Sequence, residues 1–266
     1  MHEELAERGL SYVGAQILAF FAEVGRVALL VRDTLLQIPA GLMRVGLIVQ
    51  QMYVIGVGSV WLVIIVSLFT GAVAAVQAAY QFASQVPLRY LGSVILRSVI
   101  IELGPVLTAL VVGGRVGASI AAELGTMKVT EQIDALESLG INPVRYLVVP
   151  RFLAAIIMLP LITVIANALA IFGGYVVAVS SIGISTNTYV MSLKDFFYLK
   201  DLFSGLIKSF AFGGIISIMG CHYGFATEGG AEGVGAATTR AVVSSCVLIL
   251  ISDYVLANVF FRLIFK

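Results

Sequence analysis

The sequence predicts an all-α integral membrane protein, with an N-terminal helix in the membrane interface followed by about five transmembrane helices. Two observations predict this fold class. Hydrophobic residues make up 60% of the 266 residues and charged residues only 12%, about half of the roughly 25% that soluble domains carry. Several apolar runs also exceed the roughly 18 to 20 residues that a helix needs to cross a bilayer.

The first 50 residues or so differ from the rest of the chain, which we treat as one transmembrane domain over 51–266. Arginines are spread among the apolar residues of this first region, so no window of roughly 18 residues is free of charge. They are Arg8, Arg26, Arg32 and Arg44. We therefore expect a helix that lies in or dips into the cytoplasmic interface and is broken at Pro39 and Gly41.

The expected spans follow in order along the chain. The first covers about 54–80 and the second about 91–124. At a rise of about 1.5 Å per residue the second span is roughly 50 Å long, which exceeds the hydrocarbon core of about 30 Å. We expect a kink in it at Gly104-Pro105, because proline cannot donate its backbone hydrogen bond. The remaining spans are expected at about 150–180, 202–224 and 239–264.

The charge distribution suggests an orientation and excludes some functions. Placing the N-terminal region and residues 126–145 in the cytoplasm puts most arginines on that face, as the positive-inside rule favours. This fits a multi-pass protein of a bacterial inner membrane. A net charge of +1 gives no argument for a nucleic-acid partner. Cys221-His222 supplies only two ligands with no second pair, so we expect no metal site.

A charged island, TMKVTEQIDALESLGINPVR at 126–145, separates the second span from the third. At about 100° per residue its apolar and acidic side chains fall on opposite arcs of a helix. The apolar arc holds Val129, Ile133, Leu136 and Leu139, and the acidic arc holds Glu131, Asp134 and Glu137. Gly140 followed by Asn142-Pro143 is typical of a helix stop. We expect a short amphipathic helix over about 126–140, either a solvated connection or a docking helix for a soluble partner.

The run ELGPVLTALVVGGRVGASIAAELGTMKVTEQIDALESLGINPVRYLVVPR, residues 102–151, closely resembles the MlaE-type permease family. The later stretches LIKSFAFGG and GVGAATTRAVVSS also match the family's pattern, and the resemblance covers roughly 45–266. Members of this family are membrane subunits of ABC transporters that work with MCE-domain lipid-binding proteins. The resemblance implies a homodimer with an ATPase subunit docked under each copy, an MCE-domain periplasmic partner, and phospholipids or related lipids as substrate.

The resemblance also identifies the charged island as the coupling helix, with its charged face toward the ATPase. The candidate coupling residues are Lys128, Glu131, Asp134, Glu137 and Arg145. We expect the chain itself to bind no cofactor, and ATP and Mg to sit on the partner ATPase. The stretch GGAEGVGAATTR is not a P-loop, because Ala236 and Ala237 stand where such a loop needs Lys and then Ser or Thr. We interpret it as a flexible cytoplasmic turn.

Ionisable residues inside the expected spans are candidates for a lipid cavity. Glu102 and Lys208 each lie several residues inside the outer end of a span, and Arg97 lies about a turn and a half from Glu102. Buried charges in a membrane are costly, so they tend to face a cavity or each other. Alternatively, Lys208 extends to the outer interface and Glu102 has a structural role.

Two further patterns occur in the second span. Small residues recur every four positions, a spacing that permits close helix contact within the subunit, at a dimer interface or at a gate. They are Ala109, Gly113, Gly117, Ala121 and Gly125. Arg115 and Glu123 lie two turns apart near the cytoplasmic end, where we expect a structural ion network with neighbouring loops.

Two other classes of function are less consistent with the sequence. A secondary transporter or channel would favour internal repeats and several polar groups at mid-membrane. An intramembrane enzyme would need a nucleophile–base or metal constellation, and the spans contain no HExxH, GxSxG or paired-aspartate motif. We therefore expect a non-enzymatic permease subunit.

Overall fold

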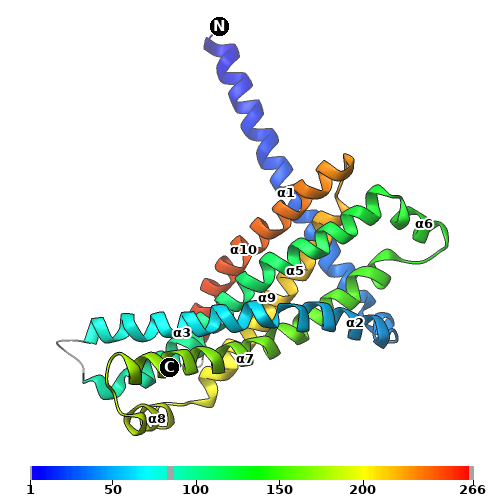
Figure 1. The fold of residues 1–266 in the computed structure, drawn as a ribbon. Coiled ribbons are helices and arrows are strands. Elements are labelled where there is room, and N and C mark those ends of the chain that lie inside the picture. Colours follow the sequence, from blue (N-terminus) through cyan, green and yellow to red (C-terminus); the bar gives the residue numbers. More distant parts are fainter. Residues whose placement is uncertain (1, 83–86, 264–266) are drawn as a thin grey trace.

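The computed structural model describes residues 2–82 and 87–263, and side chains within 14–82 and 87–262. Every regular element in these ranges is helical, as the sequence predicts (Figure 1). The long helices are α1 (His2–Gly41), α3 (Val60–Phe82), α5 (Gly104–Val129), α7 (Val149–Ser180), α9 (Leu199–Phe225) and α10 (Gly230–Leu263). The short ones are α2 (Val45–Ile55), α4 (Leu91–Ser98), α6 (Gln132–Ser138) and α8 (Thr186–Asp195).

Among the described residues, 6 helical stretches are long and apolar enough to cross a membrane. They are 14–41, 45–82, 88–129, 144–180, 199–225 and 230–262. The last five correspond to the five predicted spans, and the predicted end of the fifth, residue 264, lies outside the described residues. The first is the part of α1 that the sequence assigns to the interface, so by length and composition alone the structure offers one span more than predicted.

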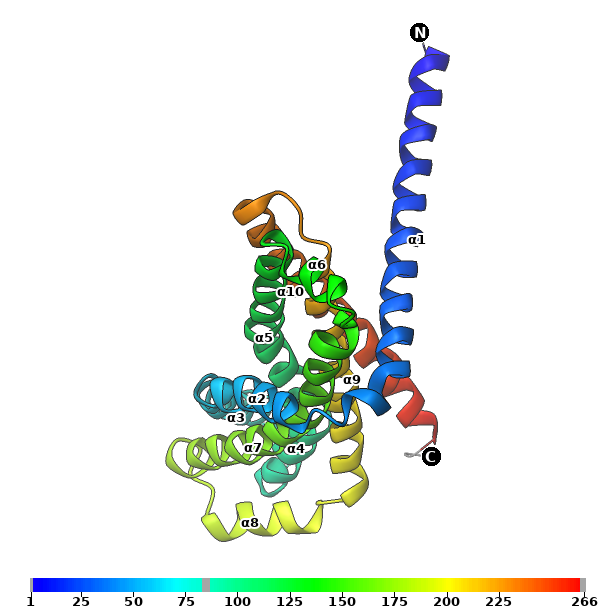
Figure 2. The ribbon, with the colours of Figure 1, turned by 90° about the vertical axis from the view of Figure 1, so that its right-hand side faces the viewer.

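Helix α1 runs across the direction of α5 and α10 (Figure 1), and its N-terminal part stands clear of the other helices (Figure 2). From residue 23 to residue 41 one face of α1 packs on the rest of the protein, whereas residues 15–22 are exposed. Of the two predicted breaks, α1 continues through Pro39 and ends at Gly41, whose Cα lies against Val149 at the start of α7. Thus α1 packs on the end of the bundle that carries α6.

Proline sets the irregularities of two long helices. A π-helical segment, Val99–Leu103, immediately precedes Gly104-Pro105, where we predicted a kink. A second π-helical segment, Val144–Val148, precedes Pro150 in the same way. Because the proline ring excludes the carbonyl one turn earlier, a wider turn at this point accommodates it. The third span was predicted to begin at Pro150, but the helical chain begins at Val144.

The main hydrophobic core lies between α5, α7 and α9, with Phe212, Ile216 and Leu159 at its centre. Beside it, α3 and α7 approach until their backbones touch. A Cβ atom at Gly173 would lie 2.2 Å from the carbonyl oxygen of Leu68, so only glycine fits. Close contact through small residues is how helices associate in lipid, where no hydrophobic driving force brings them together.

The glycine-rich stretch before the last span is not the flexible turn that we predicted. Between α9 and α10 only residues 226–229 lie outside helices, and α10 begins at Gly230, about nine residues before the predicted start. Left-handed backbone is confined to Gly229 and Gly230, with φ of 84° and 71°. The later glycines and alanines continue the helix because alanine favours it and offsets the glycines' cost.

Candidate coupling and lipid sites

The charged island folds as two pieces, not as the single helix over 126–140 that we predicted. Helix α5 continues to Val129, and Glu131 adopts left-handed backbone with φ of 59°, which turns the chain before α6 begins. Ile133 is buried in the main core and Leu136 packs against it. Val129 and Leu139 do not complete this face as predicted: both are exposed, because one belongs to α5 and the other lies beyond α6.

The acidic side chains of the island are exposed, as the amphipathic pattern predicts: Glu131, Asp134 and Glu137. Lys128 on α5 donates a hydrogen bond from Nζ to Oδ1 of Asp134 at 2.7 Å and so ties α6 to the end of α5. Arg145 lies half-buried in the π-helical segment after α6 and is not part of the same exposed face.

The stop after α6 has the predicted residues and a definite geometry. Gly140, with φ of 73°, donates to the carbonyl of Glu137 at 2.9 Å, and Ile141 donates to Leu136 at 2.9 Å. This pair of bonds is the Schellman motif, which satisfies the last carbonyls of a helix. Asn142 then begins the next helix, since its Oδ1 accepts bonds from the backbone of Val144 at 2.9 Å and Arg145 at 3.2 Å. Helix α6 is therefore a compact segment with fixed ends.

Glu102 and Lys208, predicted from their positions in two different spans, form an ion pair. Lys208 is fully buried, and it also contacts Oδ1 of Asp253 on α10 at 2.8 Å. Counting about 1.5 Å per residue from Leu199, Lys208 lies roughly 14 Å inside its helix end. It therefore pairs at depth and does not extend to the interface. Sequence reasoning missed Asp253, although its position one residue after an apolar run was a signal.

Arg97 makes a separate pair, with Oδ2 of Asp201 at 3.1 Å. Asp201 is buried on the first turn of α9, and it too escaped the sequence analysis. A cavity of about 420 Å³ lies between these charges, and both Lys208 and Arg97 line it together with Glu102. Ala257 and Phe260 of α10 form its apolar wall. The structure thus brings all three predicted cavity residues to one cavity, at the ends of the helices far from α6.

The small-residue stripe of α5 faces the inside of the subunit. Ala109, Gly113, Gly117, Ala121 and Gly125 are all buried. A Cβ at Gly113 would meet Ile216 of α9 at 3.3 Å, and one at Gly125 would meet Thr227 at 2.8 Å. Of the alternatives left open by the sequence, these contacts favour packing within the subunit.

Arg115 and Glu123 do not share one ion network. Arg115 donates to the carbonyl of Val54 at 3.2 Å and to Oγ of Ser59 at 3.0 Å, and so joins α5 to the α2–α3 junction. Glu123 pairs with Arg151 on α7, whose Nη2 lies 2.8 Å from Oε1 of the carboxylate. Arg151 is itself buried. Two turns of helix separate the residues and aim them at different neighbours.

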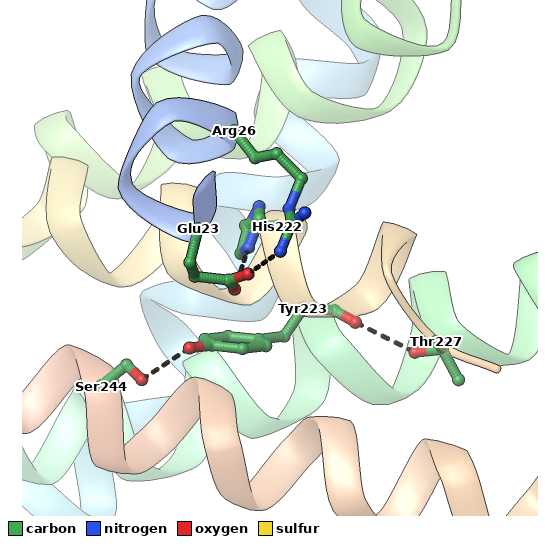
Figure 3. Close-up of polar contacts among 6 residues, drawn as sticks. All are labelled: Glu23, Arg26, His222, Tyr223, Thr227 and Ser244. Carbon is green, nitrogen blue, oxygen red and sulfur yellow. Dashed lines mark hydrogen bonds and ion pairs between the residues drawn. The ribbon is translucent and has the colours of Figure 1, made fainter. Parts of the chain in front are cut away.

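A polar cluster attaches α1 to α9 (Figure 3). His222 Nε2 lies 2.6 Å from Oε1 of Glu23, and Arg26 pairs with the other oxygen of the same carboxylate. Tyr223 bonds Ser244 of α10 at 2.9 Å. The pair with Glu23 gives the buried His222 a partner within the described chain. No group of three or more residues suited to hold a metal occurs among the residues described.

Proteins similar to this chain occur in bacteria and in a plant. The model of the family "Permease MlaE" matches residues 48–259. A probable ABC transporter permease protein of Rickettsia typhi is 42% identical over 250 residues, 94% of this chain and 96% of its own length. The intermembrane phospholipid transport system permease protein MlaE of Haemophilus influenzae is 31% identical over 253 residues, 95% of this chain and 97% of that protein. The chloroplastic protein TRIGALACTOSYLDIACYLGLYCEROL 1 of Arabidopsis thaliana is 39% identical over 213 residues, 80% of this chain and 61% of that protein.

The matched residues contain the whole of α6, both π-helical segments and all three predicted cavity residues. Multiple apolar helices together with these matches make the chain a multi-pass inner-membrane protein, and it belongs to the MlaE family of permeases.

Proposed function

We propose that the chain is the membrane subunit of an ABC transporter that moves phospholipids or related lipids, and that a separate ATPase drives it by pressing on α6. The observation that carries this proposal is the structure of α6. It is a short helix with an acidic exposed face, a buried anchor at Ile133, and a Schellman stop that makes its far end stiff. A stiff element held close to two membrane helices transmits a displacement, whereas a flexible loop would absorb it.

The substrate proposal rests on the cavity beside Lys208 and on the name of the Haemophilus relative, which specifies phospholipid transport. The cavity combines an apolar wall with buried charge, and a lipid offers both an acyl chain and a charged head group. Arg97 is the best placed to attract a phosphate, because its side chain is 42% exposed, whereas Lys208 is enclosed by two carboxylates. Glu102 and Asp253 then hold Lys208 in place.

The proposed mechanism is conformational. Two copies of the chain form the permease, and ATP binding draws the two ATPases together. The α6 helices move with them, and a lipid cavity that lies between the copies and includes the cavity beside Lys208 of each copy opens or collapses. An MCE-domain protein receives or delivers lipid on the face of α8, and α1 lies in the cytoplasmic interface. The crosswise course of α1 and its packing on the α6 end support this last placement.

The test is affinity purification of the full chain in mild detergent, with mass spectrometry of the proteins and lipids that accompany it. We expect an ABC ATPase in equal amount, an MCE-domain protein and bound phospholipid. Recovery of the chain alone, before and after gentle crosslinking, would contradict the proposal. A transport assay adds a second test. Lys208→Ala and Glu102→Ala should each impair lipid transfer, and full transfer by both variants would show that this cavity is not the lipid site.

A further inference from the structure

The ion pair between Glu123 and Arg151 lies at the base of the segment that carries α6. Glu123 is on α5, six residues before that helix ends at Val129, and Arg151 is in the first turn of α7. Arg151 Nη2 lies 2.8 Å from Glu123 Oε1, and Nη1 donates to the carbonyl of Leu147 at 2.8 Å. The pair therefore connects the two helices between which α6 is suspended.

The burial of Arg151 distinguishes this pair from an ordinary surface contact. Its side chain is 4% exposed, although an arginine at a helix end could reach water. A guanidinium keeps its charge at any physiological pH, so a buried one requires a partner. Within the described chain, Glu123 is the carboxylate that pairs with it. The fold thus places a permanent charge between α5 and α7, and the carboxylate that compensates it comes from the other helix.

The elements around the pair explain what it can do. Glu131 turns the chain sharply after α5, and Asn142 caps the next helix, so both connections to α6 are short. α5 and α7 contact each other, and both pack on α9 around the main hydrophobic core. α5 also packs on α10, and α7 on α3. The ion pair adds a charged bond between α5 and α7 at the end that carries α6, where a push on α6 would first act.

We propose that Glu123 and Arg151 form a brace that makes α5, α6 and α7 move as one body, so that force applied to α6 reaches the whole transmembrane bundle. Both are positioning residues, because they act through α6. This inference rests on the proposed function, in which α6 receives the force.

The test compares the wild-type complex with the Glu123→Gln variant, each purified with its copurifying ATPase and reconstituted in phospholipid vesicles. Glutamine keeps an oxygen that can accept a bond from Arg151 but removes the charge that holds it. We expect the ATPase to remain bound and its ATP turnover to stay within about twofold of wild type. We expect the lipid transferred per ATP hydrolysed to fall at least about fivefold, the lower end of typical coupling between sites. Glu232→Gln, an exposed glutamate on α10, is the matched control and should leave the ratio unchanged.

The exchanged pair, Glu123→Arg with Arg151→Glu, re-forms the ion pair and should recover part of the lost ratio. An intact Glu123→Gln complex with an unchanged ratio would overturn the brace. So would a variant in which ATP turnover and lipid transfer fall together, since α6 would then be failing to engage the ATPase. If the wild-type chain binds no ATPase at all, it is the proposed function that fails, and the two failures are distinguishable.

Discussion

Replacing Lys208 by methionine keeps the length and apolar stem of the side chain and removes its charge. The lysine side chain is 1% exposed, and it lies between Glu102, 44% exposed, and Asp253, 14% exposed. Breaking a buried ion pair by removing one partner costs about 3 to 5 kcal/mol, because the remaining charge is left uncompensated. Glu102 is exposed enough to be hydrated once the lysine is gone, so we expect a loss of stability at the lower end of this range, about 3 kcal/mol. Most of that loss comes from the uncompensated charge of Asp253, which is less exposed.

For a domain of this size each kcal/mol shifts the midpoint by roughly 2 to 4 °C, so Lys208→Met should lower the apparent Tm by about 6 to 12 °C. The assay is size-exclusion chromatography of detergent-solubilised protein after heating. Lys194→Met, an exposed lysine on α8, is the control and should change the midpoint little. Combining Lys208→Met with Glu102→Gln and Asp253→Asn should restore most of the loss. A shift for Lys208→Met no larger than that of Lys194→Met would refute the reasoning.

Three other variants probe the contacts that hold the site in place. Glu23→Ala deprives the buried His222 of its partner at a cost of about 1 to 3 kcal/mol, so a Thr34→Cys probe, buried on α1, should react with maleimide about fivefold faster or more than in the chain with Glu23 intact. Asp33→Ala, at an exposed position, is the control, and an equal rate in both variants would contradict the attachment of α1. Gly173→Ala must push α3 away from α7 and should lower the free energy of unfolding by about 1 to 3 kcal/mol. Gly46→Ala, where a Cβ has nothing within 4 Å, should be neutral, and similar thermal midpoints for the two variants would disprove the close contact. Asn142→Ala removes a helix cap worth about 1 kcal/mol and should lower the Tm by roughly 2 to 4 °C. Asn142→Ser should keep a Tm close to wild type, and equal Tm values for the two variants would show that the cap has no role.

Hydropathy and local stop signals were sufficient to predict the spans and the end of α6. The run of apolar residues has to be long enough to cross the bilayer, and Gly140 is followed by residues that cannot continue the helix. Glu102 and Lys208 could also be singled out, because a charge inside a span has few places to go. The sequence could not show that they meet, since the residues lie 106 positions apart.

The structural details that escaped the sequence depend on tertiary contacts or on backbone conformation. Asp253 and Asp201 pair with residues of other helices, and no local pattern reveals which helix will lie opposite. The break at Glu131 occurs in a non-glycine residue with positive φ, which carries no sequence signal of its own. The burial of Arg151 depends likewise on its partner, Glu123, which comes from α5. For these three charged residues the decisive fact is which helices are neighbours.

The central claim, that an ATPase presses on α6, is tested most directly by crosslinking in isolated native membranes. A cysteine placed at the exposed Glu137 of α6, with Lys194→Cys on α8 as the control, would be treated with a short bifunctional maleimide and its adducts identified by mass spectrometry. The account predicts an ABC ATPase crosslinked to Glu137→Cys and absent from Lys194→Cys. An ATPase captured equally by both variants, or by neither, would contradict it.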